Sequence, residues 1–140
     1  MITPYLVFNG NCQEAMDFYR SVFPCSEPTI MNYGDYMPEG STTPPDLLRS
    51  WVMHGEMVIC GTNVWFADES APPVKGDSIR LSATVPTGKE AAAIYEALSI
   101  GGTVTLEPVE TFYSVFHACV TDKFSINWNV VALEQPANKE

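Results

Sequence analysis

The sequence has little positive charge. It holds 7 Lys and Arg against 17 Asp and Glu, for a formal net charge of −10 at pH 7. Proteins that bind nucleic acids gather cationic side chains to replace the counterions of the phosphates, and here the few cationic residues are dispersed. We therefore expect no nucleic-acid partner, and we interpret the excess of acid mainly as a property that favours solubility.

Long apolar runs and paired cysteines are also missing. No run approaches the about 20 apolar residues of a membrane helix, and no basic segment followed by an apolar stretch indicates an export signal. The four cysteines, Cys12, Cys25, Cys60 and Cys119, form no C-x-x-C pair, which favours a reduced protein over a disulfide framework. We expect a cytoplasmic protein with no membrane partner. Its 140 residues, 46% of them hydrophobic, are typical of one globular domain.

Two similar segments each combine a strand with a helix start. In the first, YLVFNGNCQEAMDFYRSVF at 5–23, Asn11 and Glu14 are spaced as in a capping box, and apolar residues then recur at helical spacing. In the second, Thr87 and Glu90 have the same spacing, and Gly101 provides a helix stop. The pattern N-x-x-E-A-x-x-x-Y of the first segment matches T-x-x-E-A-x-x-x-Y of the second.

Each of these helices is preceded by one strand pattern and followed by three. The six following strands are predicted at 27–34, 49–56, 57–65, 102–110, 113–121 and 124–132. We therefore predict an α+β fold of two tandem βαβββ modules, at 1–65 and 78–134, joined by a linker at 66–77. The Pro-rich segment 34–48 is too long for a hairpin turn, and both a binding lid or interface arm and a plain surface loop remain open for it.

Five stretches together resemble a known family: ITPYLVFNGNCQEAMDFY, MNYGDYMPEG, VMHGEM, GGTVTLEPVETFY and VTDKFSINW. They are similar to the PhnB-like branch of the vicinal-oxygen-chelate superfamily, which includes glyoxalase I, bleomycin and fosfomycin resistance proteins and extradiol dioxygenases. The resemblance implies the glyoxalase/bleomycin resistance fold, in which curled mixed sheets with helices on their convex side form a cleft, and a homodimer. The branch is often labelled a 3-demethylubiquinone methyltransferase, yet this sequence has no G-x-G-x-x-G turn after a strand.

The resemblance also places the superfamily's four metal ligands. They fall at Pro4, Cys60, Ser78 or Arg80, and Asn129. A shift of one residue would place there Thr3 or Tyr5, Ile59 or Gly61, Ile79, and Trp128 or Val130. Neither set suits zinc or iron, and the two histidines, His54 and His117, match no ligand position. We predict no metal and no cofactor; the alternative is a divalent metal held by a non-standard set that uses His54, Glu56 or Cys60.

Strand periodicity then predicts which side chains line the cleft. Ser78, Arg80, Ser82 and Thr84 share one strand face, and the ligand positions also turn Leu6, Phe8, Asn127 and Asn129 toward the cleft. The resemblance adds His54 and Tyr113 at the cleft mouth. The residues predicted to contact a ligand are Phe8, His54, Cys60, Arg80, Ser82, Tyr113, Asn127 and Asn129.

Arg80 is the sharpest of these candidates. Its guanidinium suits a carboxylate, phosphate or phosphonate, although an ion pair with one of the chain's acids is equally open. We therefore expect a protein that binds a small organic molecule. If Arg80 faces the ligand and forms no ion pair, that molecule is anionic. The alternatives are a metal-dependent lyase, isomerase or dioxygenase, and a purely structural dimer partner whose cleft is filled by its own side chains.

Metal analysis distinguishes the first two interpretations. Because the ligand positions hold poor donors, protein purified without chelator should contain far less than one equivalent of zinc, nickel, manganese or iron by elemental mass spectrometry. One equivalent of any of these metals would favour the metal-dependent enzyme.

Overall fold

The structure is a computed structural model that describes residues 1–36 and 48–137. The chain divides into two compact units, Met1–Val74 and Lys75–Glu140, and their boundary lies inside the segment 66–77. Of the segment 34–48, residues 37–47 lie outside the described residues, so the open interpretations of it are not tested. No helix among the described residues is long and apolar enough to cross a membrane.

The first unit is a four-stranded sheet with one long helix. Its elements are β1 (Tyr5–Phe8), α1 (Cys12–Val22), β2 (Thr29–Asn32), the short α2 (Tyr33–Tyr36), β3 (Val52–Ile59) and β4 (Thr62–Asp68). The strand order is β1-β4-β3-β2. The outer strand β1 is parallel to β4, whereas β4 and β2 are both antiparallel to β3.

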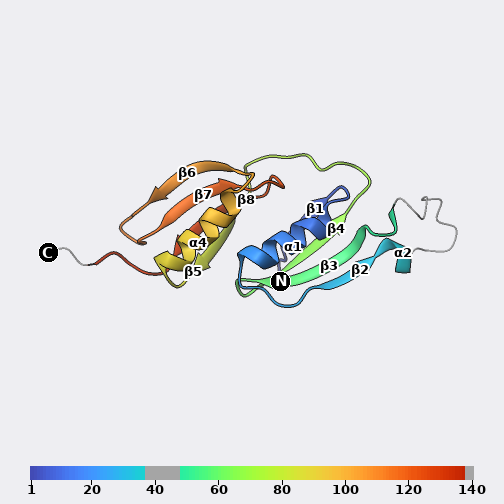
Figure 1. Cartoon of the computed structure of the whole chain (residues 1–140), viewed down its shortest axis with the longest axis horizontal. Helices are drawn as coiled ribbons and strands as arrows, with labels where there is room; N and C mark the ends of the chain where they lie inside the picture. Colours follow the sequence, from blue (N-terminus) through green and yellow to red (C-terminus); the bar gives the residue numbers. More distant parts are fainter. Residues whose placement is uncertain (37–47, 138–140) are drawn as a thin grey trace. The chain divides into compact units, whose positions relative to one another are not determined.

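The second unit repeats this plan. Its elements are β5 (Leu81–Val85), α4 (Gly88–Ser99), β6 (Thr103–Val109), β7 (His117–Thr121) and β8 (Asn127–Ala132). The strand order β5-β8-β7-β6 corresponds to that of the first unit, and β5 is again parallel to β8. Figure 1 shows one long helix, α1 or α4, against its own sheet in each unit. The predicted α+β fold of two βαβββ modules is confirmed.

The strand bounds of the first unit differ from the predicted ones around a hairpin. We predicted a break between residues 56 and 57, but β3 runs on to Ile59 and the chain reverses at Cys60 and Gly61. Their φ values are +48° and +87°, and positive φ at both central residues is what a type I′ hairpin turn requires. Gly61 adopts this conformation freely, and Cys60 takes the place that Asn usually holds. Cys60 is therefore a turn residue, which corrects its predicted place on a strand.

The core of the first unit lies between α1 and one face of the sheet. Met16 and Tyr19 of α1 are fully buried, and the Tyr19 ring lies 6.2 Å from that of Phe66 on β4. Phe8 stacks on Phe66 at 6.5 Å and is only 3% exposed. Phe8 thus packs on the helix side of the sheet, which corrects its predicted position in the cleft. Gly55 leaves room here, since a Cβ on it would lie 2.9 Å from the Met16 sulfur.

In the second unit, α4 packs on the apolar sides of the central strands. Ala91, Ile94 and Leu98 of the helix are buried, as are the sheet residues Ala83, Val85, Ala118, Val120, Trp128 and Val130. The predicted capping box is present, because Glu90 N–H donates to Thr87 Oγ1 at 3.2 Å and Thr87 N–H donates to Glu90 Oε2 at 3.2 Å. The helix ends at Ser99, just before Gly101 with φ +73°.

The first helix is capped differently from our prediction. Asn11 makes no side-chain capping bond. Instead, the buried carboxylate of Asp68, at the end of β4, accepts from the backbone N–H groups of Gly10 (2.6 Å), Cys12 (3.1 Å) and Val52 (2.9 Å). A charged acceptor at a helix N-terminus also interacts favourably with the helix dipole. Asp68 therefore joins the start of α1 to β3 and β4, and no cationic side chain among the described residues forms an ion pair with it.

Asp122 performs a related task in the second unit. It is 3% exposed, and its Oδ1 accepts from Phe124 N–H (2.8 Å) and Ile126 N–H (3.1 Å) in the turn before β8. Its Oδ2 accepts from the indole N–H of Trp128 at 2.9 Å. The carboxylate thus fixes both the turn and the buried Trp128. Because Trp128 faces α4, its neighbours Asn127 and Asn129 face the opposite side of the sheet.

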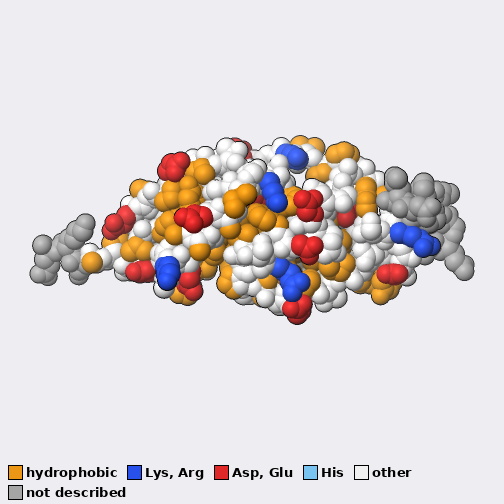
Figure 2. Space-filling view, in the orientation of Figure 1, with side chains coloured by type: hydrophobic (Ala, Val, Ile, Leu, Met, Phe, Trp, Pro, Cys, Tyr) orange, Lys and Arg blue, Asp and Glu red, His pale blue; other side chains and the backbone are white. Residues whose placement is uncertain are grey.

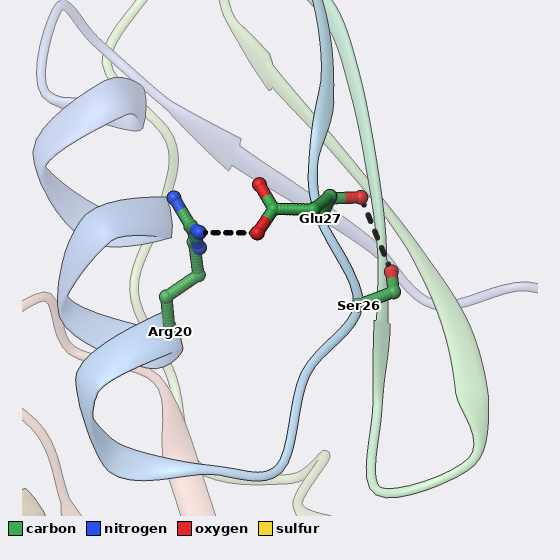
Figure 3. A network of polar contacts seen from close by, with 3 residues as sticks. All are labelled: Arg20, Ser26 and Glu27. Carbon is green, nitrogen blue, oxygen red and sulfur yellow. Dashed lines mark hydrogen bonds and ion pairs between the residues drawn. The ribbon is translucent and has the colours of Figure 1, made fainter.

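Ion pairs contribute less than these buried carboxylates. Arg20 of α1 donates to Glu27 at 2.9 Å, and the neighbouring Ser26 hydroxyl donates to the Glu27 carbonyl at 3.3 Å (Figure 3). Both charged side chains are exposed, so the pair contributes about 0–1 kcal/mol. Figure 2 shows acidic side chains scattered over the face in view and interspersed with other types. On that face the excess of acid forms no single patch.

The substitution Asp68→Ala tests the role of the buried carboxylate. It leaves three backbone N–H groups without their charged acceptor, two of them in buried bonds. We expect the free energy of unfolding to fall by about 2–4 kcal/mol, measured by urea denaturation, with faster amide exchange at Cys12 and Val52. The control Glu27→Gln removes the exposed ion pair and should cost less than about 1 kcal/mol. Equal effects of the two substitutions would contradict the assignment.

Candidate functional site

Each sheet has one face that its long helix does not cover. We call the uncovered side of the first unit the first open face, formed by Tyr5, His54, Glu56, Asn63 and Trp65. The strand register places them together, since Trp65 lies beside Tyr5 in β1 and beside Glu56 in β3. Tyr5 is 47% exposed and Trp65 is 38% exposed. Burial, and then the nearby Glu69 carboxylate, raise the pKa of Tyr5, which keeps its hydroxyl protonated.

The side chains of the first open face contact one another. The His54 and Trp65 rings meet edge to face with their centroids 5.1 Å apart, and Tyr5 meets Trp65 in the same way at 6.0 Å. His54 Nε2 lies 3.9 Å from Glu56 Oε1, which also accepts from the Asn63 amide at 3.3 Å. This face is therefore aromatic with one acidic edge, and the predicted residue His54 lies within it.

The second unit carries a more polar surface, the second open face. It consists of Ser82 and Thr84 of β5, Asn127, Asn129 and Val131 of β8, and His117, Cys119 and Thr121 of β7. The register aligns them in rows, with Asn129 between Ser82 and Cys119. Their strand neighbours Ala83, Trp128 and Val130 are buried on the α4 side. The alternation predicted for β5 and β8 is thus present, with Ser82 and Thr84 exposed.

His117 lies at the centre of a hydrogen-bonded row on the second open face. Its Nδ1 is 2.8 Å from the Tyr113 hydroxyl, and its Nε2 is 4.0 Å from the Cys119 sulfur. The Cys119 thiol in turn donates to Asn129 Oδ1 at 3.0 Å. An imidazole with a thiol on one nitrogen and an orienting hydroxyl on the other is an arrangement that can move a proton.

The loop before β7 fixes Tyr113 beside His117. Ser114 is fully buried, and its hydroxyl contacts the carbonyls of Phe116 (2.8 Å) and Ala132 (2.7 Å). The preceding turn is closed because Tyr113 N–H donates to Thr111 Oγ1 at 3.3 Å. Tyr113 itself stays 42% exposed. The Tyr113 hydroxyl is therefore held in place by the buried loop and remains accessible to a ligand.

The predicted polar residues fall into two groups. Ser82 and Asn129 lie side by side on the second open face, and Tyr113 borders it through its contact with His117. Asn127 lies on it too, but its Nδ2 donates to the Gly76 carbonyl at 2.6 Å and its Oδ1 accepts from Thr121 at 2.8 Å. These bonds leave Asn127 holding the segment before β5 in place.

Three of the four predicted ligand positions need correction. Cys60 lies in the β3–β4 turn, and its backbone N–H donates to the Pro24 carbonyl at 3.0 Å. Pro4 precedes β1, and the first residue of this strand on the open face is Tyr5. Arg80 and Ser78 precede β5, so neither is part of the strand as predicted. Arg80 is exposed, and the alternative of an ion pair to an acid is not formed with any residue that the structure describes.

Sequence reasoning missed His117 and Cys119. The signal was present, because H-A-C-V-T at 117–121 alternates polar and apolar residues with the period of a strand. Treating each histidine as isolated hid the fact that β7 lies between β6 and β8. Only this strand pairing reveals that His117 and Cys119 share a polar row with Asn129 of β8.

The donors of each unit do not fit the superfamily's metal ion. On the first open face two donor side chains, His54 and Glu56, come close, and on the second His117 and Cys119 do. Across residues 1–36 and 48–137 no group of three His, Cys, Asp or Glu gathers that could hold a metal. A structural or catalytic site takes at least three protein ligands, so we derive no step through a metal.

The fold has counterparts in solved structures. Protein PA1353 from Pseudomonas aeruginosa is 27% identical with a TM-score of 0.77, over 94% of this chain and 96% of that one. A PhnB protein from Bacillus cereus is 21% identical with a TM-score of 0.72, over 94% and 98%. A glyoxylase/bleomycin resistance protein/dioxygenase domain from Frankia sp. EAN1pec has a TM-score of 0.64 at 13% identity, over 94% and 95%. These similarities define a protein of the glyoxalase/bleomycin resistance fold.

The family follows from the sequence comparison. Residues 1–131 match the model of the family described as 3-demethylubiquinone-9 3-methyltransferase, and the chain belongs to this PhnB-like family. Among characterised sequences, Protein YjdN of Escherichia coli (strain K12) is 24% identical over 150 residues, which cover 96% of each chain.

The cysteines of the first unit give a test of how far burial suppresses thiol reactivity. Burial raises the pKa of Cys25 to about 11 and also raises that of Cys60. Because only the thiolate is alkylated, Cys25 in the folded protein at pH 8 should react with iodoacetamide about a hundredfold more slowly than in urea. Peptide mass spectrometry measures this for each thiol, and an equal rate for Cys25 in both states would contradict the burial seen here.

Proposed function

We propose that this protein binds a small organic acid on the second open face, without a metal ion. The observation that carries the proposal is the row Tyr113–His117–Cys119–Asn129, which holds polar groups in fixed positions on the sheet face that α4 does not cover. Ligand sites typically combine an apolar surface with a few placed polar groups. Here Val131 of β8 and the partly exposed Leu106 and Val109 of β6 provide the apolar part.

Two groups on this face have free hydrogen-bonding capacity. The Asn129 oxygen accepts from the Cys119 thiol, which leaves its Nδ2 for a ligand oxygen. Ser82, directly beside Asn129 in the register, is exposed and adds a hydroxyl. Both groups can donate to a carbonyl or an acid oxygen. A ligand lying along the face would contact Ser82 and Asn129 at one end and Tyr113 at the other.

Arg80 supports the choice of an acid. It comes directly before Leu81, and Leu81 pairs with Trp128, so Arg80 lies near the Asn127 end of the face. Its guanidinium has no ion-pair partner in the part of the chain that the structure describes. In a protein with a net charge of −10, such a cation is a favourable place for an anionic group.

The activity in the family's description finds no support in the strand-to-helix turns. Cofactors of open α/β sheets bind at a helix N-terminus that follows a parallel strand. After β1, the Asp68 carboxylate takes the N–H groups of Gly10 and Cys12. After β5, Glu134 accepts from Gly88 N–H at 2.8 Å, and the capping box satisfies the N–H groups of Thr87 and Glu90. Both turns are thus filled by the chain's own carboxylates, which favours a binding protein over a methyltransferase.

Location and assembly follow as further proposals. A cytoplasmic location is supported by four cysteines that are all free. The homodimer implied by the resemblance stays a prediction, and light scattering tests it directly. The metal-dependent enzyme is the remaining alternative, and no donor group in the described residues favours it.

Arg80→Ala tests the proposed ligand class. Benzoate and phenylphosphonate should raise the melting temperature of the wild-type protein more than neutral benzamide does, because only the acids meet Arg80. In Arg80→Ala this difference should disappear while the melting temperature without ligand is unchanged. The control Lys89→Ala removes an exposed cation on α4 and should keep the difference. Equal shifts for acid and amide in the wild type would refute the anionic ligand, and loss of folding in Arg80→Ala would make Arg80 structural.

A further inference from the structure

The Cys119–His117 pair has a geometry that reversible binding does not need. The Cys119 sulfur lies 4.0 Å from His117 Nε2, with both side chains on the same face of β7. The other ring nitrogen, Nδ1, is 2.8 Å from the Tyr113 hydroxyl. When Nδ1 carries the proton and donates it to Tyr113, Nε2 is left with the free lone pair that faces the thiol. A nucleophile, a base and a group that orients the base thus lie side by side in one chain of contacts.

We propose that Cys119 is a nucleophilic thiol that adds to small α,β-unsaturated carbonyl compounds, with His117 as its base. The Cys119 S–H turns from Asn129 Oδ1 to His117 Nε2 and passes its proton there, and the sulfur electron pair forms a C–S bond to the β-carbon of the acceptor. The π electrons of the acceptor move to its carbonyl oxygen, and the α-carbon then takes the proton back from His117. The product is a thioether, and no oxidant, reductant or leaving group is needed.

Two neighbouring groups suit this reaction. The Asn129 amide contacts the sulfur at 3.0 Å and can rotate so that its N–H₂ donates to the thiolate. The Tyr113 hydroxyl fixes the ring orientation of His117 and makes Tyr113 a positioning residue. The other three thiols have no such base, since in the described residues neither imidazole contacts Cys12, Cys25 or Cys60.

Access to Cys119 limits the class of acceptor. Cys119 is only 6% exposed, whereas Tyr113 beside it is 42% exposed. A narrow, unbranched acryloyl group can reach the sulfur along the open face, but a bulky reagent cannot. The inference adds a covalent step to the proposed function and rests on it only for the ligand's approach to this face.

Alkylation by acrylamide at pH 7.5, followed by peptide mass spectrometry, tests the proposal on the whole chain. Cys119 should be alkylated at least tenfold faster than Cys12, Cys25 and Cys60, which serve as internal controls. His117→Ala should slow the reaction of Cys119 about a hundredfold, as expected for loss of a general base. The matched control His54→Ala removes the histidine of the first open face and should leave the rate unchanged.

Tyr113→Phe separates a positioning role from a structural one. It should slow Cys119 alkylation by about fivefold and shift His117 in nitrogen NMR spectra from the Nδ1–H toward the Nε2–H tautomer. If His117→Ala unfolds, all four thiols will react faster together, and Tyr113→Phe then decides: slower alkylation supports the proposal and an unchanged rate refutes it.

Two results would overturn the inference. They are a Cys119 rate no greater than that of Cys25, and a Cys119 rate unaffected by the loss of His117 in a folded variant. Neither result touches the Arg80-dependent binding of benzoate, which is measured without an electrophile. Conversely, loss of the benzoate effect with rapid Cys119 alkylation would refute the organic-acid ligand and keep the nucleophile.

Discussion

One long helix for each four-stranded sheet is the constraint from which the functional surface follows. A strand turns alternate side chains to opposite faces, so the face packed on the helix takes the apolar residues and leaves the other free for polar ones. Trp128 and Val130 are buried against α4, while Asn129 between them lies on the open side. The polar row across β7 and β8 is therefore a consequence of one-sided packing, repeated in both units.

The same alternation explains which predictions succeeded. The Thr87–Glu90 capping box was predicted because all of its parts lie within four residues of the sequence. The faces of β5 and β8 were correct because apolar and polar residues alternate through β5 and through the first half of β8. The fold of two βαβββ modules followed from repeated local patterns, and the strand orders of the two sheets agree with it.

The failures have long-range causes. Anchoring the first strand on Pro4 shifted its pattern by one residue, and a shift of one residue exchanges the two faces of a strand. Phe8 was therefore placed in the cleft although it stacks on Phe66. The cap of α1 was assigned to Asn11 because Asp68 is far away in sequence and reaches the helix only through the folded sheet. His117 and Cys119 were missed because their partners Tyr113 and Asn129 lie on other elements.

The buried carboxylates Asp68 and Asp122 have a consequence for how this protein responds to salt. Ions in solution weaken attractions between exposed charges, but they act little on charges sequestered from the solvent. Here both carboxylates are satisfied by N–H groups of the protein, and the exposed Arg20–Glu27 pair contributes little. In the described part of the chain, backbone and indole N–H groups thus hold these two carboxylates, and the exposed ion pair adds little. The architecture should withstand high ionic strength, while attraction of an anion to Arg80 should weaken in the same solutions.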